Sequence, residues 1–485
     1  MEIVDEALNK AQVAFLSYKN FSGKKKATFL RAIADEIEAS GKELVATAMR
    51  ETNLPEARII NERGRTTGHC RMFADLVEEG SWVDARVDTA LPDRLPAPKP
   101  DLRKKLVPVG PVVVFGAANF PLAYSTAGGD TVSALAAGCP VIVKAHPAHL
   151  ETSTLVAAAI KKAVTKTGMP QDVFQHVQGE GFQIGQALVK HPFTKAVGFT
   201  GSLSGGKALF DLANQRPEPI PVFAEMSSIN PVILLPETLA RDAPKTAIML
   251  AGSITLGVGQ FCTNPGLIIA IDNEGLKSFI SALANEIQKV VPGAMLHQGI
   301  AENYARRLTL TLAQKGVKVE AQSATQGNST QGTALIASVA AETFIQNPAL
   351  AEEVFGPFSL IVKCKDINEL HAVVVKGHGQ LTSTVVGDEA EIASYKALLN
   401  VLIEKAGRLI INGVPTGVEV CPSQMHGGPF PSTTDSRFTA VGADAIKRFA
   451  RPVAFQNFPE SLLPDELKTE NPLGIWRMVN GELKK

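Results

Sequence analysis

Cys262 is the first residue in this chain whose position indicates chemistry. It lies in GQFCTN (259–264), after a helix-like run that the glycines Gly257 and Gly259 interrupt. A turn of this kind can expose a thiol, and nearby backbone amides can lower the thiol pKa and so raise its thiolate fraction. The alternative is a buried packing residue, which describes most free cysteines, and Cys139 and Cys364 fit that alternative.

Two other polar side chains follow strand-like runs. Glu225 closes such a run in FAEMSSINP (223–231), and Asn119 follows another in GAANFP (116–121). Functional groups gather where the strands of a parallel sheet end. Glu225 is therefore a candidate general base, or else a solvated carboxylate. Asn119 could donate to a developing oxyanion, or it could simply form a turn.

A possible phosphate site lies in VGFTGSLSGG (197–206), where a strand-like run leads through small residues into a helix. Free backbone N–H groups at a helix start bind phosphate. The segment lacks the GxGxxG pattern. GEGFQIG (179–185) also misses that fingerprint, because its glycines recur at offsets of two and six.

The composition limits the class of protein. The chain has 485 residues, 45% of them hydrophobic, and its 48 Lys and Arg balance its 48 Asp and Glu. We therefore expect at least two domains and neither a nucleic-acid nor a membrane partner. The five cysteines are widely spaced without a CxxC pair, which argues against a disulfide framework or a structural zinc site, so we expect no metal. A reducing cytoplasm fits this usage, and the acidic start MEIVDEALNK is not a signal peptide.

The elements that must position these groups follow from the periodicity of the sequence. Apolar spacing predicts helices over 4–18 and 26–50, and Val- and Ile-rich runs then alternate with helical segments from about residue 105 onward. Such runs suit strands that are buried on both faces of a parallel sheet. We therefore predict two α/β domains in series. The Pro-rich, charged stretch 91–106 reads as a linker or an extended excursion.

Six motifs together resemble the aldehyde dehydrogenase superfamily. They are NFP (119–121), VIVKAHPAH (141–149), FTGS (199–202), AEMSSINP (224–231), GQFC (259–262) and EEVFGPF (352–358). Within it, KAHPAH and HGGPFPST (426–433) are similar to bacterial 2-oxoglutarate semialdehyde (2,5-dioxopentanoate) dehydrogenases, a branch shared with some NADP-dependent aliphatic aldehyde dehydrogenases. The resemblance implies an aldehyde dehydrogenase-like α/β fold of two Rossmann-like domains plus a small oligomerisation hairpin.

That resemblance also implies domain limits and an assembly. They are a cofactor-binding domain at 1–90 and 111–229, a catalytic domain at 230–445, and oligomerisation segments at 91–110 and 446–485. The expected assembly is a homodimer or a homotetramer.

The resemblance assigns roles to single residues. Cys262 matches the nucleophile, Glu225 the base that activates water, and Asn119 the oxyanion donor that acts with the Cys262 backbone N–H. The positions that match cofactor-binding residues are Lys144, His146, Gly181, Gly185, Phe199, Thr200, Gly201, Ser202, Glu353 and Phe355. The cofactor would be NADP or NAD. NADP is favoured because Pro147 stands where NAD-preferring relatives often carry a carboxylate, while His146 and His149 add polar or positive character.

The substrate is expected to be a small-molecule aldehyde. Phe120 should line the tunnel, and Arg65, in ERGRTTGHCR (62–71), could pair with a distal carboxylate, although an exposed helix face is the plainer interpretation. The predicted reaction is oxidation of 2,5-dioxopentanoate to 2-oxoglutarate through a cysteine thiohemiacetal and thioester. The alternatives are a broad or long-chain aliphatic aldehyde dehydrogenase and a catalytically silent structural or binding protein on the same scaffold. An acyl-phosphate reductase is a further alternative. Such an enzyme does not need a hydrolytic base, so the presence of Glu225 argues against it.

Overall fold

A five-stranded parallel sheet forms the centre of the N-terminal lobe. The computed structural model describes residues 2–179 and 181–485, and the sheet has the order β5-β4-β3-β6-β7. Its strands are β3 (Val112–Phe115), β4 (Val141–Lys144), β5 (Phe174–Val177), β6 (Ala196–Thr200) and β7 (Val222–Glu225). Val112 and Val114 pack on one face and Val113 on the other, so β3 is apolar throughout rather than alternating.

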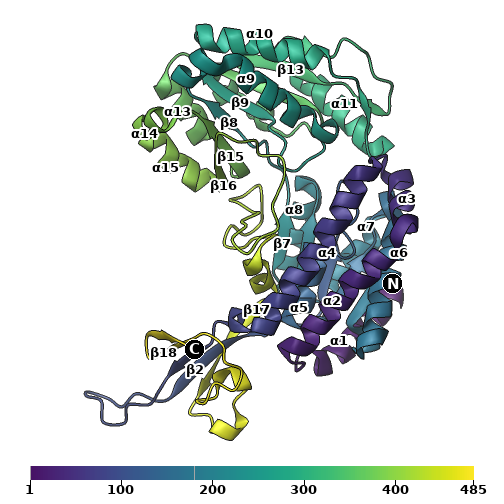
Figure 1. Cartoon of the computed structure of the whole chain (residues 1–485), viewed down its shortest axis with the longest axis vertical. Coiled ribbons are helices and arrows are strands. Elements are labelled where there is room, and N and C mark those ends of the chain that lie inside the picture. Colours follow the sequence, from purple (N-terminus) through teal and green to yellow (C-terminus); the bar gives the residue numbers. More distant parts are fainter. Residues whose placement is uncertain (1, 180) are drawn as a thin grey trace.

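Helices cover both faces of this sheet (Figure 1). One face packs against α2 (Gly23–Ala39), α3 (Gly41–Thr52), α4 (Glu56–Glu79), α5 (Gly129–Ala137) and α6 (Leu150–Thr167). The other face packs against α1 (Glu2–Tyr18), α7 (Phe182–Lys190) and α8 (Leu203–Asn214). The helix predicted over 26–50 is in fact two, because α2 ends at a Ser40 cap and Gly41 has a φ of +54°.

The C-terminal lobe contains a seven-stranded sheet of order β11-β13-β14-β9-β8-β15-β16, in which only the β11–β13 pair is antiparallel. Its strands are β8 (Val232–Leu234), β9 (Leu267–Ile271), β11 (Lys318–Gln322), β13 (Leu335–Ala340), β14 (Phe358–Cys364), β15 (Gln380–Val386) and β16 (Ala406–Ile411). Its helices are α9 (Pro236–Thr255), α10 (Glu274–Gln288), α11 (Gln298–Leu312), α12 (Ala341–Gln346), α13 (Ile367–Lys376), α14 (Glu389–Ser394) and α15 (Lys396–Lys405). A two-stranded ribbon, β10 (Gly293–Ala294) and β12 (Gln331–Gly332), lies beside it. The prediction of two successive parallel α/β units is confirmed.

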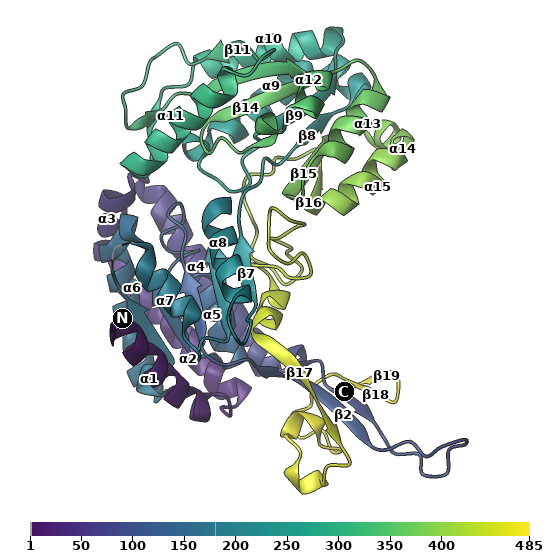
Figure 2. The same ribbon diagram turned by 180° about the vertical axis from the view of Figure 1, so that it is seen from behind.

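A separate sheet projects from the N-terminal lobe as an arm, at the end away from the C-terminal lobe (Figures 1 and 2). Its order is β17-β2-β1-β18-β19, with β1 (Arg86–Asp88), β2 (Leu102–Pro108), β17 (Ala450–Gln456), β18 (Arg477–Val479) and β19 (Glu482–Lys484). The last part of the predicted linker 91–106 is therefore strand. The tail beyond residue 459 packs on this sheet, where Leu463, Leu467 and Ile475 form a small core with Val83 and Ala85.

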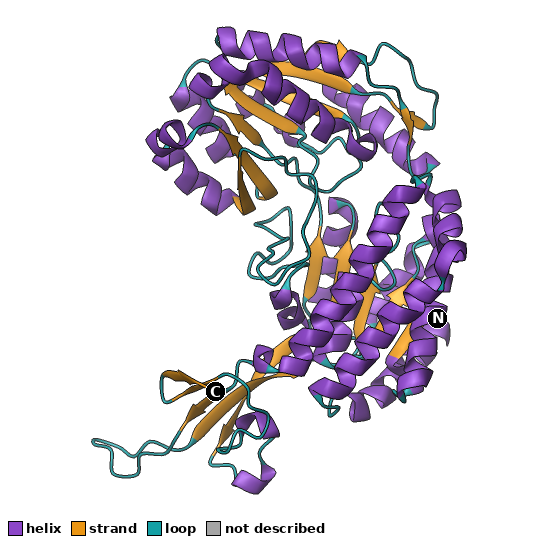
Figure 3. Cartoon of the chain, viewed as in Figure 1, coloured by secondary structure: helices purple, strands orange, loops and turns teal. Residues whose placement is uncertain are grey.

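Short 3-10 helices complete the chain, and Figure 3 shows how loops join the lobes. They are η1 (Ser81–Val83), η2 (Pro147–His149), η3 (Gln171–Val173), η4 (Leu256–Gly259), η5 (Pro348–Ala351), η6 (Ala443–Phe449), η7 (Glu460–Leu462) and η8 (Asp465–Leu467). Across 2–179 and 181–485, no helix combines the length and apolar character needed to cross a membrane.

One long segment returns from the C-terminal lobe to the N-terminal lobe and completes the edge of its sheet. After β16 the chain pairs with β7: the Met226 N–H donates to the Ser432 carbonyl at 2.8 Å, and the Thr434 N–H donates to the Ala224 carbonyl at 3.1 Å. Glu225 and Thr433 form an antiparallel bridge between these contacts. The returning segment is therefore fixed beside the end of β7.

Candidate active site

A tight left-handed turn presents Cys262. Gly257, Val258 and Gly259 have φ values of +55°, +60° and +66° at the end of η4. A Cβ at Gly259 would lie 2.3 Å from the backbone of Gly356, so only glycine fits there. All five cysteines are free, and only Cys262 and Cys421 are partly exposed. The sequence-based expectation that this turn exposes a thiol agrees with this geometry.

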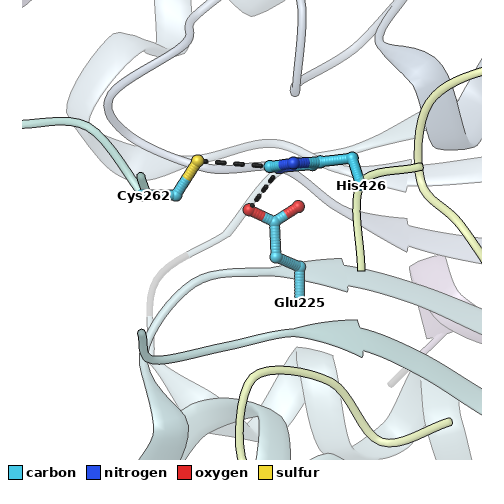
Figure 4. Close-up of side chains that lie close together, drawn as sticks. All are labelled: Glu225, Cys262 and His426. Atoms are coloured by element: carbon cyan, nitrogen blue, oxygen red, sulfur yellow. Dashed lines mark hydrogen bonds and ion pairs between the residues drawn. The ribbon is translucent and has the colours of Figure 1, made fainter. Parts of the chain in front are cut away.

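Glu225 and His426 lie next to that thiol (Figure 4). The Cys262 Sγ is 3.7 Å from His426 Nε2, and His426 Nε2 is 3.0 Å from Glu225 Oε1. Glu225 is only 4% exposed and His426 only 1%. The His426 backbone N–H donates to Thr439 Oγ1 at 2.8 Å, which helps to hold the returning segment in place.

His426 was missed as a site residue by the sequence reasoning. It opens the HGGPFPST segment, which only contributed to the family resemblance. A histidine within a glycine-rich loop was the available signal, but its partner Glu225 lies 201 positions earlier in the chain. Only the pairing of Ser432 and Thr434 with β7 brings the two together.

Burial and charge set the protonation of this cluster. Burial raises the pKa of Cys262 well above its ordinary value, and the neighbouring Glu225 raises it further. The lower thiol pKa expected from the sequence is therefore wrong for the free protein, because burial and a like charge outweigh any nearby amides. Burial also opposes ionisation of Glu225, but His426 and the Cys262 thiol outweigh it and hold the pKa of Glu225 below its ordinary value. In the free protein the thiol therefore keeps its proton, and an ionised carboxylate beside it can accept that proton.

Asn119 lies against the backbone that carries Cys262. Its Nδ2 donates to the Gln260 carbonyl at 3.1 Å, and Arg58 donates to the Asn119 carbonyl at 3.4 Å. The side-chain amide of Asn119 is thus held against Gln260, which precedes Cys262 by two positions in the chain. Cys262, Glu225 and Asn119, which occur in separate motifs, meet at the junction of the two lobes.

A cavity of about 200 Å³ opens on Cys262. We call it the Cys262 cavity. Its lining residues include Arg58, Glu62, Arg65, Phe120, Tyr124, Phe261 and Cys262. Phe120 and Arg65, the two residues proposed from the sequence to meet the substrate, both lie here.

The two arginines of this cavity differ in their partners. Arg58 lies 3.4 Å from Glu62, and the other oxygen of Glu62 accepts from the backbone N–H groups of Leu122 and Ala123. Arg65 donates instead to the neutral Tyr124 hydroxyl at 3.2 Å, and no carboxylate in the described chain forms an ion pair with it. Arg65 is thus the cation of the cavity that has no anionic partner.

Spacing on α4 could have revealed Arg58. Positions 58, 62 and 65 follow one another at intervals of four and three, which places them on one face of a helix. The other arginines of this region point elsewhere, since Arg71 pairs with Glu38 and Asp35, and Arg63 donates to the Gly41 carbonyl.

The cofactor positions predicted on the first sheet gather at its carboxyl edge. Phe115 is in register with Lys144 on one side and with Phe199 on the other, and Thr200 is in register with Glu225. Ser202 caps α8 by accepting from the Gly205 N–H. A Cβ at Gly201 would meet the Phe199 ring at 2.7 Å, so the turn before α8 requires a small residue.

The glycines and histidines predicted for the same site differ in their surroundings. Gly181 has a φ of +76° with open space around it, whereas Gly185 packs against the Phe115 ring. Burial and the neighbouring His149, His297 and Lys144 lower the pKa of His146 to about 3, so its ring is neutral near pH 7. His149 is fully buried, and its Nε2 contacts the Ala117 carbonyl at 3.0 Å. The positive character expected of His146 is therefore wrong.

Glu353 and Phe355 line a different, small cavity, together with Gly259 and Phe261. Glu353 accepts from Ser227 Oγ at 3.0 Å, and burial raises its pKa to about 7 despite that hydrogen bond. Ser227 belongs to the MSSIN run that follows Glu225. The serines in this run therefore bind Glu353, a contact that the sequence did not predict.

A partly exposed thiol beside a buried carboxylate, at the junction of two parallel α/β lobes, is the arrangement expected of a cysteine-dependent enzyme. The chain belongs to the aldehyde dehydrogenase family, whose sequence profile matches residues 1–452. It is an aldehyde-oxidising oxidoreductase that uses a nicotinamide cofactor, as its sequence predicted. Members of this family act on aldehydes and are typically oligomeric.

Similar proteins are known by sequence and by structure. The alpha-ketoglutaric semialdehyde dehydrogenase 2 of Azospirillum brasilense is 52% identical over 480 residues, which is 99% of this chain and 91% of that enzyme. The alpha-ketoglutaric semialdehyde dehydrogenase of Acinetobacter baylyi is 48% identical over 484 residues, covering 100% of this chain and 92% of that enzyme.

Among solved structures, a glyceraldehyde-3-phosphate dehydrogenase of Methanocaldococcus jannaschii complexed with NADP superposes with a TM-score of 0.79. Its identity is 20%, and 94% of each chain is covered. A 1-pyrroline-5-carboxylate dehydrogenase superposes with a TM-score of 0.78 at 20% identity, covering 93% of this chain and 85% of that one. These two likenesses establish the fold.

Proposed function

We propose that this enzyme oxidises 2,5-dioxopentanoate, the semialdehyde of 2-oxoglutarate, to 2-oxoglutarate. The observation that carries the proposal is the presence of Arg65, without an anionic partner, in the same cavity as the Cys262 thiol. A short chain with an aldehyde at one end and a carboxylate at the other can join these two groups. The names of the two relatives at 52% and 48% identity support the same substrate.

The residues at the carboxyl edge of the first sheet suit a nicotinamide dinucleotide. The Lys144 side chain, the Gly201 turn and the capped start of α8 supply a positive charge, a close backbone approach and free N–H groups. When bound, the nicotinamide accepts the hydride that aldehyde oxidation releases. We propose that NADP is preferred, because Pro147 offers no carboxylate against a 2′-phosphate. The positive charge comes from Lys144, since the His146 ring is neutral.

We assign the steps on the protein as follows. Ionised Glu225 takes the Cys262 thiol proton, and the sulfur attacks the aldehyde carbon to give a thiohemiacetal. The Asn119 amide and the Cys262 N–H stabilise the oxyanion, and loss of one such donor costs about 100- to 1000-fold in rate. Oxidation leaves a thioester on Cys262. Glu225 releases the thiol proton to solvent and, ionised again, activates water to hydrolyse the thioester, while His426 donates to the carboxylate and orients it.

The proposed division of labour follows the lobes. Residues 1–90 and 111–229 would bind the cofactor, and 230–445 would supply the nucleophile. Segments 91–110 and 446–485 would join subunits into a dimer or a tetramer through the projecting arm. The free cysteines suit a cytoplasmic setting.

Steady-state kinetics test the substrate. We expect kcat/KM for 2,5-dioxopentanoate to exceed that for hexanal and decanal, with NADP used better than NAD. Arg65→Met should raise KM for 2,5-dioxopentanoate about 10- to 100-fold, because it removes a hydrogen-bonded charge worth about 1.5–3 kcal/mol. It should leave hexanal turnover nearly unchanged. The matched control is Arg71→Met, on an exposed face of the same helix. Equal or better use of decanal by the wild type would refute the proposal.

A further inference from the structure

The side chains of the catalytic cluster have a second chemistry, as metal ligands. Glu225, Cys262 and His426 each offer one ligand atom, and these atoms all lie within 4.8 Å of one another. We infer that the free enzyme binds a single Zn²⁺ ion through Cys262 Sγ, His426 Nε2 and a Glu225 oxygen, and that this ion reversibly blocks catalysis. The inference rests on the geometry of the cluster and not on the identity of the aldehyde.

The distances suit a tetrahedral ion. Zinc binds thiolate sulfur at about 2.3 Å and imidazole nitrogen or carboxylate oxygen at about 2.0–2.2 Å, which places adjacent ligand atoms about 3.3–3.6 Å apart. The observed separations are 3.7 Å for the sulfur and nitrogen and 3.0 Å for the nitrogen and oxygen. The sulfur and the carboxylate oxygen lie within 4.8 Å of each other, so they would have to approach by at most about 1.5 Å to complete a zinc site.

A polar atom without a partner points to the same conclusion. Glu225 Oε2 is buried and forms no hydrogen bond, although the residue is only 4% exposed. Leaving a buried carboxylate oxygen unsatisfied is costly, and a divalent cation would satisfy it. Two anionic ligands, the Cys262 thiolate and the Glu225 carboxylate, would also balance the charge of the ion.

The surroundings leave a fourth position open. Cys262 lines the cavity of about 200 Å³, which has room for a water molecule to complete the tetrahedron, as in zinc sites with three protein ligands. Arg65, which has no anionic partner, lies in the same cavity, and its charge opposes the ion. Binding displaces the thiol proton to solvent, so it strengthens as pH rises. A sulfur bonded to zinc cannot attack an aldehyde.

The direct test uses Co²⁺ as a coloured substitute for zinc on the metal-free, cofactor-free enzyme. We expect one equivalent of Co²⁺ to produce a thiolate-to-cobalt charge-transfer band in the near ultraviolet, which Zn²⁺ then abolishes. Cys262→Ser should lose the band, and Glu225→Gln and His426→Ala should weaken binding at least tenfold. Cys421→Ser, which removes the other partly exposed cysteine, should keep it. Thermal unfolding verifies that each variant is folded.

The outcomes separate this inference from the proposed function. No band in the wild type, or a band that survives Cys262→Ser, would overturn the zinc site even if 2,5-dioxopentanoate is the substrate. An enzyme that binds cobalt but does not oxidise 2,5-dioxopentanoate would overturn only the substrate proposal. Zinc should also slow alkylation of Cys262 by iodoacetamide at least tenfold, and a chelator should restore it. Inhibition by zinc without that protection would place the ion elsewhere and count against the inference.

Discussion

At the scale of single residues, His426 determines how acidic Glu225 can be. Its Nε2 lies 3.0 Å from Glu225 Oε1, and its charge lowers the pKa of that buried carboxyl. In the proposed mechanism Glu225 must be ionised to accept a proton, so we expect activity to fall as the pH drops through its pKa. Without His426, burial dominates and the pKa of Glu225 rises.

We therefore expect His426→Ala to lower kcat about 10- to 100-fold and to move the acidic limb of the kcat–pH profile to higher pH. A profile recorded from pH 5 to 9 measures both effects. His371→Ala, which changes a histidine of the C-terminal lobe on α13, is the matched control. A lower kcat with an unmoved acidic limb would mean that His426 only supports the local structure.

We expect Glu225 to have opposite effects on two reactions of Cys262: it slows alkylation by iodoacetamide and promotes aldehyde turnover. Its negative charge raises the pKa of the thiol, so Glu225→Gln should lower that pKa and increase the thiolate fraction near neutral pH. We expect iodoacetamide to alkylate this variant faster than the wild type at pH 7.5, although aldehyde turnover falls. Mass spectrometry of the peptide containing Cys262 follows the modification. Slower alkylation would show instead that Glu225 must remove the thiol proton even in this simple reaction.

At the scale of elements, the turn at η4 fixes where the thiol lies. A Cβ on Gly259 would approach the Gly356 backbone to 2.3 Å at a φ of +66°. Gly259→Ala should therefore lower the free energy of unfolding by about 1–3 kcal/mol and displace Cys262, so turnover falls strongly. Gly252→Ala is the matched control, since this glycine lies in α9 with open space around it.

That control should stabilise the protein by up to about 1 kcal/mol, because alanine favours helix more than glycine does. Chemical denaturation of both variants gives the comparison. Equal stability of the two alanine variants would contradict the conclusion that only glycine fits at position 259.

Elements formed by local pattern were predictable, and contacts between distant segments were not. The Val-rich run at β3 predicted a strand buried on both faces, and the motif order placed Cys262, Glu225 and Asn119 near one another. The position of His426 depends instead on the pairing of the returning segment with β7. This residue is 201 positions away from Glu225 in the chain, so no local pattern links the two. Helix α5 begins only at Gly129, and before it the Leu122 and Ala123 N–H groups donate to Glu62 on α4, a contact that no local pattern indicates.

At the scale of the whole molecule, the projecting arm has a core of its own, and the tail supplies part of it. Leu463, Leu467 and Ile475 are at most 4% exposed and belong to the segment 446–485, which the resemblance assigns to oligomerisation. Burying one such side chain contributes about 1.5–3 kcal/mol. The family profile ends at residue 452, so these three side chains lie beyond it, whereas Val83 and Ala85, which they pack against, lie within it.

Removing residues 460–485 should therefore destabilise the arm and lower the mass of the assembly in sedimentation velocity. Removing only 482–485, the exposed strand β19 and the last residue, should change the assembly little. If the longer truncation sediments as the full chain does, the core of the arm is not needed for subunit association.

The returning segment has a mechanical consequence. Pairing of Ser432 and Thr434 with β7 joins Glu225 and His426 to the N-terminal lobe, whereas Cys262 lies in the turn between α9 and β9 of the other lobe. Any rocking of one lobe against the other must then change the gap between sulfur and carboxylate. A dinucleotide that seats on the first lobe and draws the second toward it would tune the reactivity of the thiol through that gap, without touching the sulfur.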